Sequence, residues 1–239
     1  MASNRIRDPL SDACPPKRLL IFQADALISR MESTRTDQRR EAGLRTRGRL
    51  LDAALDLLAE RGEDAISLRE LTGAAQANVA AVSYHFGSLK SLCDEAIEYA
   101  LERYLASQEE AIRTLGGDAS LEDLAAAFAR PMVRAFAVGG RELDVMRIVA
   151  RSAIDPPKDW DRFDASFDRI RAGVLSVLRA NVPDVKDQEL IFRTRCAAGL
   201  LNWLVLAPVG DELRNRSERQ IDRLLVPLLA GAFSGLSSA

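Results

Sequence analysis

Residues 68–86 read LRELTGAAQANVAAVSYHF, and this stretch decides how the rest of the chain is interpreted. Ser67 precedes it and Glu70 follows three residues later, so a capping box is predicted in which each residue accepts a hydrogen bond from the other's backbone N–H. Asn78 is a good N-cap for a second helix over residues 79–86. Two short helices joined by a turn predict a helix-turn-helix, whose second helix enters the DNA major groove.

The second of these helices carries mostly small side chains. Val82 and Phe86 have the i, i+4 spacing of a shared helix face and are expected to point inward. Tyr84 and His85 have hydrogen-bonding groups that can reach phosphates. An alanine-rich buried helix with an aromatic end is the alternative that this segment alone leaves open. The residues small enough to let the backbone approach base edges are Val79, Ala80, Ala81 and Ser83.

The flanking residues favour the DNA-binding interpretation. Residues 47–58 form an amphipathic pattern, Gly62 stands where a C-cap glycine belongs, and a long helical pattern follows Gly87-Ser88. The apolar stripe of the first helix is Leu51, Ala54, Leu55 and Leu58. This run, residues 45–105, resembles the DNA-binding domain of TetR-family transcription regulators. The resemblance is carried by residues 53–58 (AALDLL), Gly62, 67–71 (SLREL) and 78–88 (NVAAVSYHFGS).

Two positions depart from the pattern of that family. Gln76 stands in the turn where the family usually has glycine, and a left-handed conformation is costly for glutamine, so a turn of another shape is one expectation. The family usually has lysine directly after the position of Ser88, whereas here Leu89 comes first and Lys90 follows. A cation in the first turn opposes the helix dipole, which favours a nearby phosphate for Lys90. A solvated surface lysine is the alternative.

Composition predicts an all-helical protein with one basic region. The chain has 239 residues, of which 47% are hydrophobic and 5% aromatic, and runs of β-branched residues are rare. Residues 35–49 hold six arginines against two acidic residues, although the net charge of the whole chain is -2. A basic start on an acidic body fits a protein that meets nucleic acid at one end, with a plain solvated basic tail as the alternative.

Several other classes of protein are disfavoured by the residues present. Cys14, Cys93 and Cys196 are too few and scattered for a disulfide framework or a metal site, so they indicate free thiols in a reducing cytoplasm. No apolar run is long enough to cross a bilayer, and no secretory signal is evident. His85 is the only histidine, which excludes the paired Glu-x-x-His motifs of a di-iron bundle. Neither a glycine-rich phosphate loop nor a nucleophile elbow is present, so neither an enzyme nor a cofactor is expected.

The expected organisation is an all-α chain in three parts. Residues 1–44 are predicted to be a disordered basic extension, with Met31 as a candidate natural start or residues 1–30 as a dispensable segment. Residues 45–105 are the helix-turn-helix domain, with the motif at 68–86. Residues 106–239 are a helical ligand-binding and dimerisation domain.

The two last helices, near residues 186–206 and 217–233, are apolar over more than one face. Such a surface would be a liability on a monomer, and two helices paired with their symmetry mates in a four-helix bundle would bury it. The resembled family dimerises in this way, and packing within one subunit is the alternative. The candidate interface residues are Leu200, Leu201, Leu204, Leu224, Leu225 and Leu228.

The middle helices are predicted to line a ligand chamber, with an ordinary apolar core as the alternative. Arg151 and Asn202 are further possible polar anchors there. The candidate ligand-binding residues are Phe128, Met132, Phe136, Met146, Arg147, Phe163, Phe167 and Trp203.

The resemblance implies a cytoplasmic homodimeric repressor that a small apolar or amphipathic ligand releases from a double-stranded DNA operator. A helical interaction module that binds protein rather than DNA is the rival function. The candidate DNA-contacting residues are Arg45, Arg47, Ser67, Asn78, Val79, Ala80, Ala81, Ser83, Tyr84, His85 and Lys90.

Overall fold

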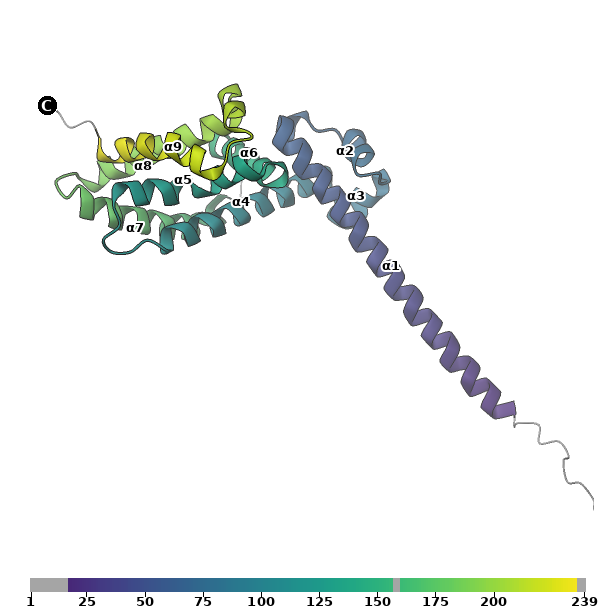
Figure 1. Cartoon of the computed structure of the whole chain (residues 1–239). Helices are drawn as coiled ribbons and strands as arrows, with labels where there is room; N and C mark the ends of the chain where they lie inside the picture. The colour runs from purple at the N-terminus through teal and green to yellow at the C-terminus, as the bar shows by residue number, and fades with distance from the viewer. Residues whose placement is uncertain (1–16, 157–159, 236–239) are drawn as a thin grey trace, which may run out of the picture. The chain divides into compact units, whose positions relative to one another are not determined.

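The computed structural model describes residues 17–156 and 160–235, and all of its regular elements are helical. The chain divides into two compact units, one ending at Thr46 and the other beginning at Arg47. The predicted all-α class is therefore confirmed over the described ranges. The elements are α1 (Lys17–Arg61), η1 (Glu63–Ala65), α2 (Leu68–Ala74), α3 (Val79–Phe86), α4 (Leu89–Arg113), α5 (Leu121–Val138), α6 (Gly140–Ile154), η2 (Trp160–Phe163), α7 (Asp164–Asn181), α8 (Asp187–Leu206), η3 (Pro208–Leu213) and α9 (Glu218–Ser234) (Figure 1).

Helix α1 begins at Lys17, which differs from the disorder expected for residues 1–44. Between Lys17 and Ala42 the sequence holds neither glycine nor proline and is rich in good helix formers, so local propensity favours one continuous helix. The part of the expected extension before Lys17, including Cys14, lies outside the described residues.

The helix-turn-helix packs on an apolar core shared with its neighbours. The predicted stripe of α1 is confirmed, because Ala54, Leu55 and Leu58 are buried and Leu51 is partly buried. The same buried cluster holds one fully buried side chain from each of the next three helices, namely Leu71 of α2, Val82 of α3 and Leu92 of α4.

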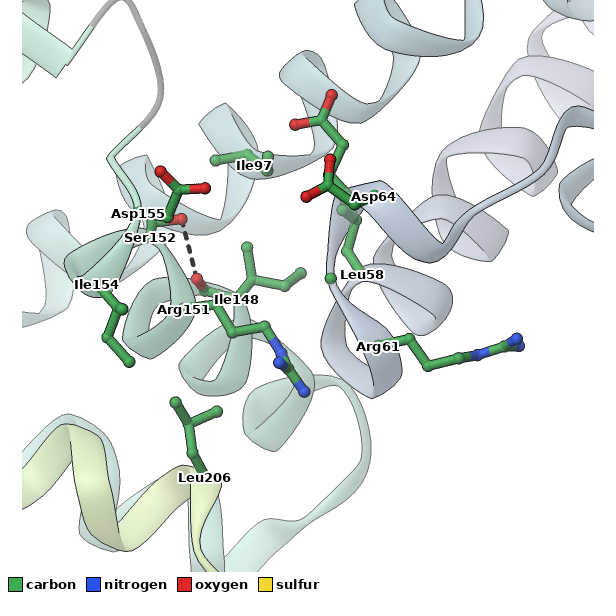
Figure 2. A pocket seen from close by; sticks show the side chains of 12 residues that line it. Leu58, Arg61, Asp64, Ile97, Ile148, Arg151, Ser152, Ile154, Asp155 and Leu206 are labelled. Atoms are coloured by element: carbon green, nitrogen blue, oxygen red, sulfur yellow. Dashed lines mark hydrogen bonds between the residues drawn. The ribbon is translucent and has the colours of Figure 1, made fainter.

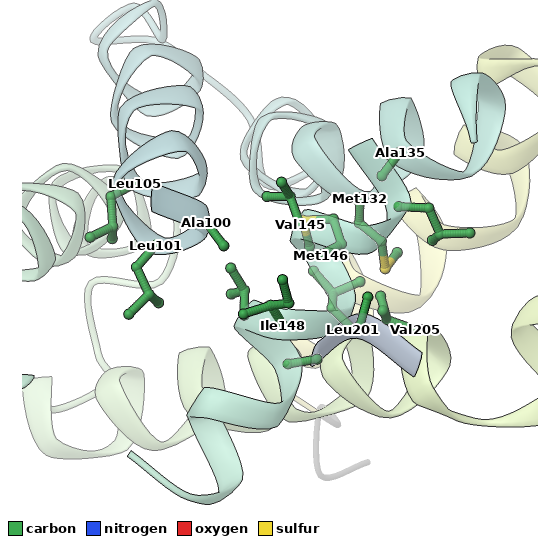
Figure 3. Packing of buried hydrophobic residues seen from close by; sticks show 14 of the residues in the cluster. Ala100, Leu101, Leu105, Met132, Ala135, Val145, Met146, Ile148, Leu201 and Val205 are labelled. Atoms are coloured by element: carbon green, nitrogen blue, oxygen red, sulfur yellow. The ribbon is translucent and has the colours of Figure 1, made fainter. Parts of the chain in front are cut away.

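Helices α4 to α9 form a bundle in which α5 contacts each of the others (Figure 1). Figure 3 shows buried side chains of α4, α5, α6 and α8 converging, with Leu101, Met132 and Ile148 among them. Both α5 and α9 contain a proline, Pro131 and Pro227, and both helices continue past it. Gly139 alone separates α5 from α6.

The turn between α2 and α3 keeps the left-handed geometry despite its glutamine. Gln76 has φ of 48°. Its N–H donates to the Gly73 carbonyl over 3.1 Å, and the Ala77 N–H donates to the Thr72 carbonyl over 2.9 Å. These two bonds are those of a Schellman motif, in which the left-handed position is normally glycine. A turn of another shape is thus not adopted, because two backbone hydrogen bonds hold the strained residue in place.

Replacing the strained residue by glycine should stabilise the protein. Gln76→Gly removes a left-handed β-carbon and is expected to raise the free energy of unfolding by about 0.5–1 kcal/mol, net of the extra entropy of glycine in the unfolded chain. Urea denaturation measures this change. The control is Gln188→Gly on an exposed helical position of α8, where the same substitution should lower stability by about 0.5 kcal/mol. A Gln76→Gly protein that is less stable than wild type would show that the turn is not strained.

Candidate functional site

Helix α3 is fixed at both ends and by one buried side chain. Asn78 Oδ1 accepts from the Ala80 N–H over 3.0 Å, as predicted for the N-cap. The Gly87 N–H donates to the Ser83 carbonyl over 3.1 Å at the other end, where Gly87 has φ of 81°. Val82 is 1% exposed and is the one fully buried residue of the helix. Anchored in this way, α3 presents its remaining face outward.

The outward face of α3 holds the residues that the sequence assigned to DNA. Tyr84 is 85% exposed, and its ring meets the ring of His85 edge-on with centroids 4.8 Å apart. Phe86 is partly buried, so the inward direction predicted for Val82 and Phe86 is confirmed. The other outward residues are Val79, Ala80 and Ser83, with Ala81 partly buried.

The predicted capping box at α2 forms only in part. Ser67 Oγ accepts from the Glu70 N–H over 3.3 Å, as expected. The Glu70 carboxylate accepts from the guanidinium of Arg61 instead of from the Ser67 N–H. A charge-assisted hydrogen bond to arginine is stronger than one to a neutral amide, which explains the exchange. This contact also raises the pKa of Arg61.

The two arginines expected to touch phosphate are held by neighbours. Arg47 donates to Glu95 and lies over the Phe86 ring, with 4.8 Å between its Cζ and the ring centroid. Arg45 belongs to the first unit and pairs with Glu41 at 2.9 Å within α1. Each is partly or fully exposed, so each guanidinium remains accessible.

Lys90 lies between two carboxylates. Its Nζ is 2.8 Å from Asp94 Oδ1 and 3.3 Å from Glu63 Oε1. The hydrogen bond to Asp94 is the main reason why the pKa of Lys90 is raised, so the lysine is fully charged at neutral pH. Lys90 is exposed and is paired with carboxylates of the protein itself, so both the phosphate contact and the solvated surface lysine remain open.

Two adjoining cavities of about 150 and 450 Å³ lie among α4, α5, α6, α7 and α8, and together they form the chamber. Four of the predicted ligand residues line one or both of them: Phe128, Met132, Met146 and Phe167. Asn202 lines the smaller cavity as well.

Four other predicted ligand residues lie elsewhere. Phe136 is buried beside Gly210, Phe163 is buried beneath the Arg162 guanidinium, and Arg147 faces Asp144. Trp203 is 57% exposed. None of them appears in the lining of the two cavities.

Tyr104 and Gln108 are among the residues of the cavity walls that the sequence analysis did not single out. Both line the two cavities from α4. Burial raises the pKa of Tyr104 to about 12, so its phenol is neutral. A polar residue in a charged helix such as α4 is normally on the surface, and only the spacing of Leu101, Tyr104 and Gln108 on one helical face signals otherwise.

Helix α6 lines the chamber and also forms hydrogen bonds with the last turns of α1. Arg141 donates to Asp56 Oδ1 over 2.8 Å and to Asp52 Oδ1 over 3.2 Å. At the other end of α6, Arg151 donates to the Glu60 carbonyl over 3.0 Å. A further cavity of about 290 Å³ is lined by Arg151 and Ile148 of α6 and by Leu58 of α1. Figure 2 shows these side chains among the residues around it.

The candidate interface residues fall into two groups. Leu201, Leu204 and Leu225 are buried within the subunit and Leu200 is partly buried. Leu224 and Leu228 are exposed on α9. The exposed apolar residues of α8 are Phe192 and Trp203, so the exposed apolar surface of these two adjoining helices consists of Phe192, Trp203, Leu224 and Leu228.

Comparisons with known proteins agree with this arrangement. The chain is similar to a TetR-family transcriptional regulator, PfmR, from Thermus thermophilus, with 22% identity, a TM-score of 0.56, and coverage of 79% of this chain and 98% of that one. It is similar to the probable transcriptional regulatory protein RHA5900, with 19% identity, a TM-score of 0.57, and coverage of 81% and 100%. A TerR/AcrR-family transcriptional regulator from Aquifex aeolicus matches with 20% identity, a TM-score of 0.50, and coverage of 77% and 97%. No curated protein matches significantly.

Two family profiles match the chain. One, "Bacterial regulatory proteins, tetR family", covers residues 50–96, and the other, "Tetracyclin repressor-like, C-terminal domain", covers residues 126–231. No helix in the described part of the chain is long and apolar enough to span a membrane. Members of these families are regulators and not enzymes, and the rival interaction module without DNA binding is not favoured. The chain belongs to the TetR family of DNA-binding transcriptional regulators.

Proposed function

We propose that the protein is a cytoplasmic homodimeric repressor that leaves its operator when a small ligand occupies the chamber of its C-terminal helices. The exposure of α3 is the observation that supports DNA binding. One side of this helix is anchored by Val82, while Tyr84 and its small neighbours face outward. Two such helices, about 34–36 Å apart in a dimer, suit a near-palindromic site.

In the complex with DNA, basic and polar side chains position the protein on the phosphate backbone, and α3 contacts the bases in the major groove. Arg45, Arg47, Tyr84, His85 and Lys90 are proposed to contact phosphates. The small side chains of α3 limit direct readout, so DNA shape contributes a large share of specificity. Ser67 and Asn78 support this surface mainly as helix caps, with their backbone at the two helix starts.

The exposed apolar surface of α8 and α9 is proposed to be the dimer interface. Trp203 and Leu228 are 57% and 59% exposed, and an aromatic anchor at such a surface is typical of interface centres. Pairing these two helices with their symmetry mates removes the apolar side chains from water. The buried candidates Leu201, Leu204 and Leu225 then support the interface from beneath.

Helix α6 is proposed to transmit ligand binding to the DNA-binding helices. Met146 and Val149 face the chamber, while Arg141 and Arg151 hold the end of α1. A ligand that shifts α6 therefore moves both contacts. Release requires that the ligand bind the non-operator conformation more tightly than the operator-bound one.

The role of Lys90 can be tested by the salt dependence of DNA affinity. Lys90→Ala is expected to weaken binding uniformly across sequences and to lower the slope of log affinity against log salt by about one. Asp94→Asn should strengthen binding, because it removes a carboxylate that competes with phosphate for the lysine. Fluorescence anisotropy on a selected duplex measures both effects, with Lys186→Ala at the start of α8 as the control. An unchanged slope in Lys90→Ala would remove Lys90 from the contact surface.

The interface can be tested by placing a charge on it. Leu228→Glu puts an unpaired carboxylate into the proposed interface and is expected to convert the dimer into a folded monomer in light scattering. Operator affinity should then fall at least tenfold, because each half-site is bound separately. The control is Val138→Glu, which changes an exposed apolar residue outside α8 and α9. A Leu228→Glu protein that remains dimeric would place the interface elsewhere.

The contact between α6 and α1 can be tested by hydrogen–deuterium exchange. Arg141→Ala removes the bonds to Asp52 and Asp56, and exposed ion pairs of this kind contribute at most about 1 kcal/mol. Amides of residues 50–61 are therefore expected to exchange roughly two- to fivefold faster, while those of α7 stay unchanged. Arg113→Ala, which breaks an exposed pair with Glu110 inside α4, is the control. Unaltered exchange in residues 50–61 would show that Arg141 does not hold α1.

A further inference from the structure

Gln108 is a buried amide that the fold itself does not satisfy. The residue is 1% exposed. Neither its Nε2 nor its Oε1 has a hydrogen-bond partner within the described part of the protein. Buried polar groups are almost always hydrogen-bonded, because an unpaired one destabilises the folded state. We therefore expect the hydrogen-bond partner of Gln108 to be a molecule other than the protein itself.

The position of Gln108 indicates where that partner binds. Its side chain lines both cavities of the chamber, together with Tyr104, Phe128 and Phe167. A molecule in either cavity would therefore lie next to Gln108, whose amide offers one donor group, Nε2, and one acceptor, Oε1.

The charges of the residues that line the chamber indicate whether the ligand is charged or neutral. The smaller cavity is lined by apolar and uncharged polar residues alone, and Tyr104 is neutral because burial raises its pKa to about 12. The larger cavity also reaches Asp164, Arg171 and Arg195, which are exposed and mark its side toward solvent. A charged group beside Gln108 in the smaller cavity would lose its hydration without gaining an opposite charge.

We propose that the effector is an uncharged molecule with an apolar body and an amide-like group that donates to Gln108 Oε1 and accepts from Gln108 Nε2. Carboxamides and lactams have this pair of groups. A carboxylate lacks the donor and carries a charge, and an ammonium lacks the acceptor. This inference deepens the proposed function, since it rests on the chamber being the effector site. It goes further by naming the residue that selects the chemical class.

Two probe molecules of equal length test the selection. Decanamide carries the proposed group, and decanoate replaces it by a carboxylate. Titration calorimetry on the full-length protein is expected to show at least tenfold tighter binding of decanamide. In Gln108→Leu the affinity for decanamide should fall by about tenfold or more, because two hydrogen bonds are lost. Gln188→Leu, on the exposed surface of α8, is the matched control and should bind as wild type does.

A second measurement does not depend on the probes. Removing an unpaired buried amide should stabilise the free protein, so the melting temperature of Gln108→Leu is expected to rise by about 2–4 °C. A residue kept for packing alone would give a lower melting temperature and unchanged probe binding.

The outcomes separate this inference from the proposed function. Equal binding of both probes, no binding of either, or unchanged decanamide affinity in Gln108→Leu would overturn the role of Gln108. Operator binding is measured in the same proteins without any probe. Failure to bind a selected duplex would sink the repressor function while leaving a measured preference for decanamide intact.

Discussion

The orientation of α3 depends on the burial of Val82, and the proposed DNA-binding surface depends on that orientation. Helices α1, α2 and α4 each contribute a fully buried leucine, and Val82 is the residue by which α3 joins them. Because no other residue of α3 is fully buried, its remaining side chains are free to be small or polar. The strained turn at Gln76 and the cap at Asn78 then determine where the helix begins. Stability and recognition are thus assigned to different sides of one short helix.

Helices α4 and α6 each line the chamber and also contact the DNA-binding helices. Helix α4 starts beside the DNA-binding surface and carries Gln108 into the chamber, while α6 touches the chamber with Met146 and α1 through Arg141. The contacts at α1 are exposed ion pairs and one bond to a carbonyl, which are weak enough to break for the free energy of binding one small molecule. The polar contacts between α6 and the end of α1 can therefore change without disturbing the apolar core.

Local signals in the sequence predicted the elements well, and tertiary contacts explain where the predictions fell short. The cap at Asn78 was identifiable because the interacting groups lie two residues apart. Glu70 differs, because a distant partner, Arg61, competes for its carboxylate. The large apolar residues of the middle helices could not be sorted into chamber, core and surface without knowing how the helices pack. Gln108 was not predicted to be buried, since a polar side chain in a charged helix is normally exposed and only its spacing from Leu101 and Tyr104 indicates otherwise.

The most direct test of this account is the binding of the full-length protein to a duplex selected from random sequence, measured by light scattering and anisotropy over a range of salt concentrations. The account predicts two subunits on each duplex and a log–log salt slope of roughly −4 to −6, as expected when several phosphates are neutralised by the pair of subunits. A stable monomer, or a protein that ignores every duplex at low salt, would contradict it.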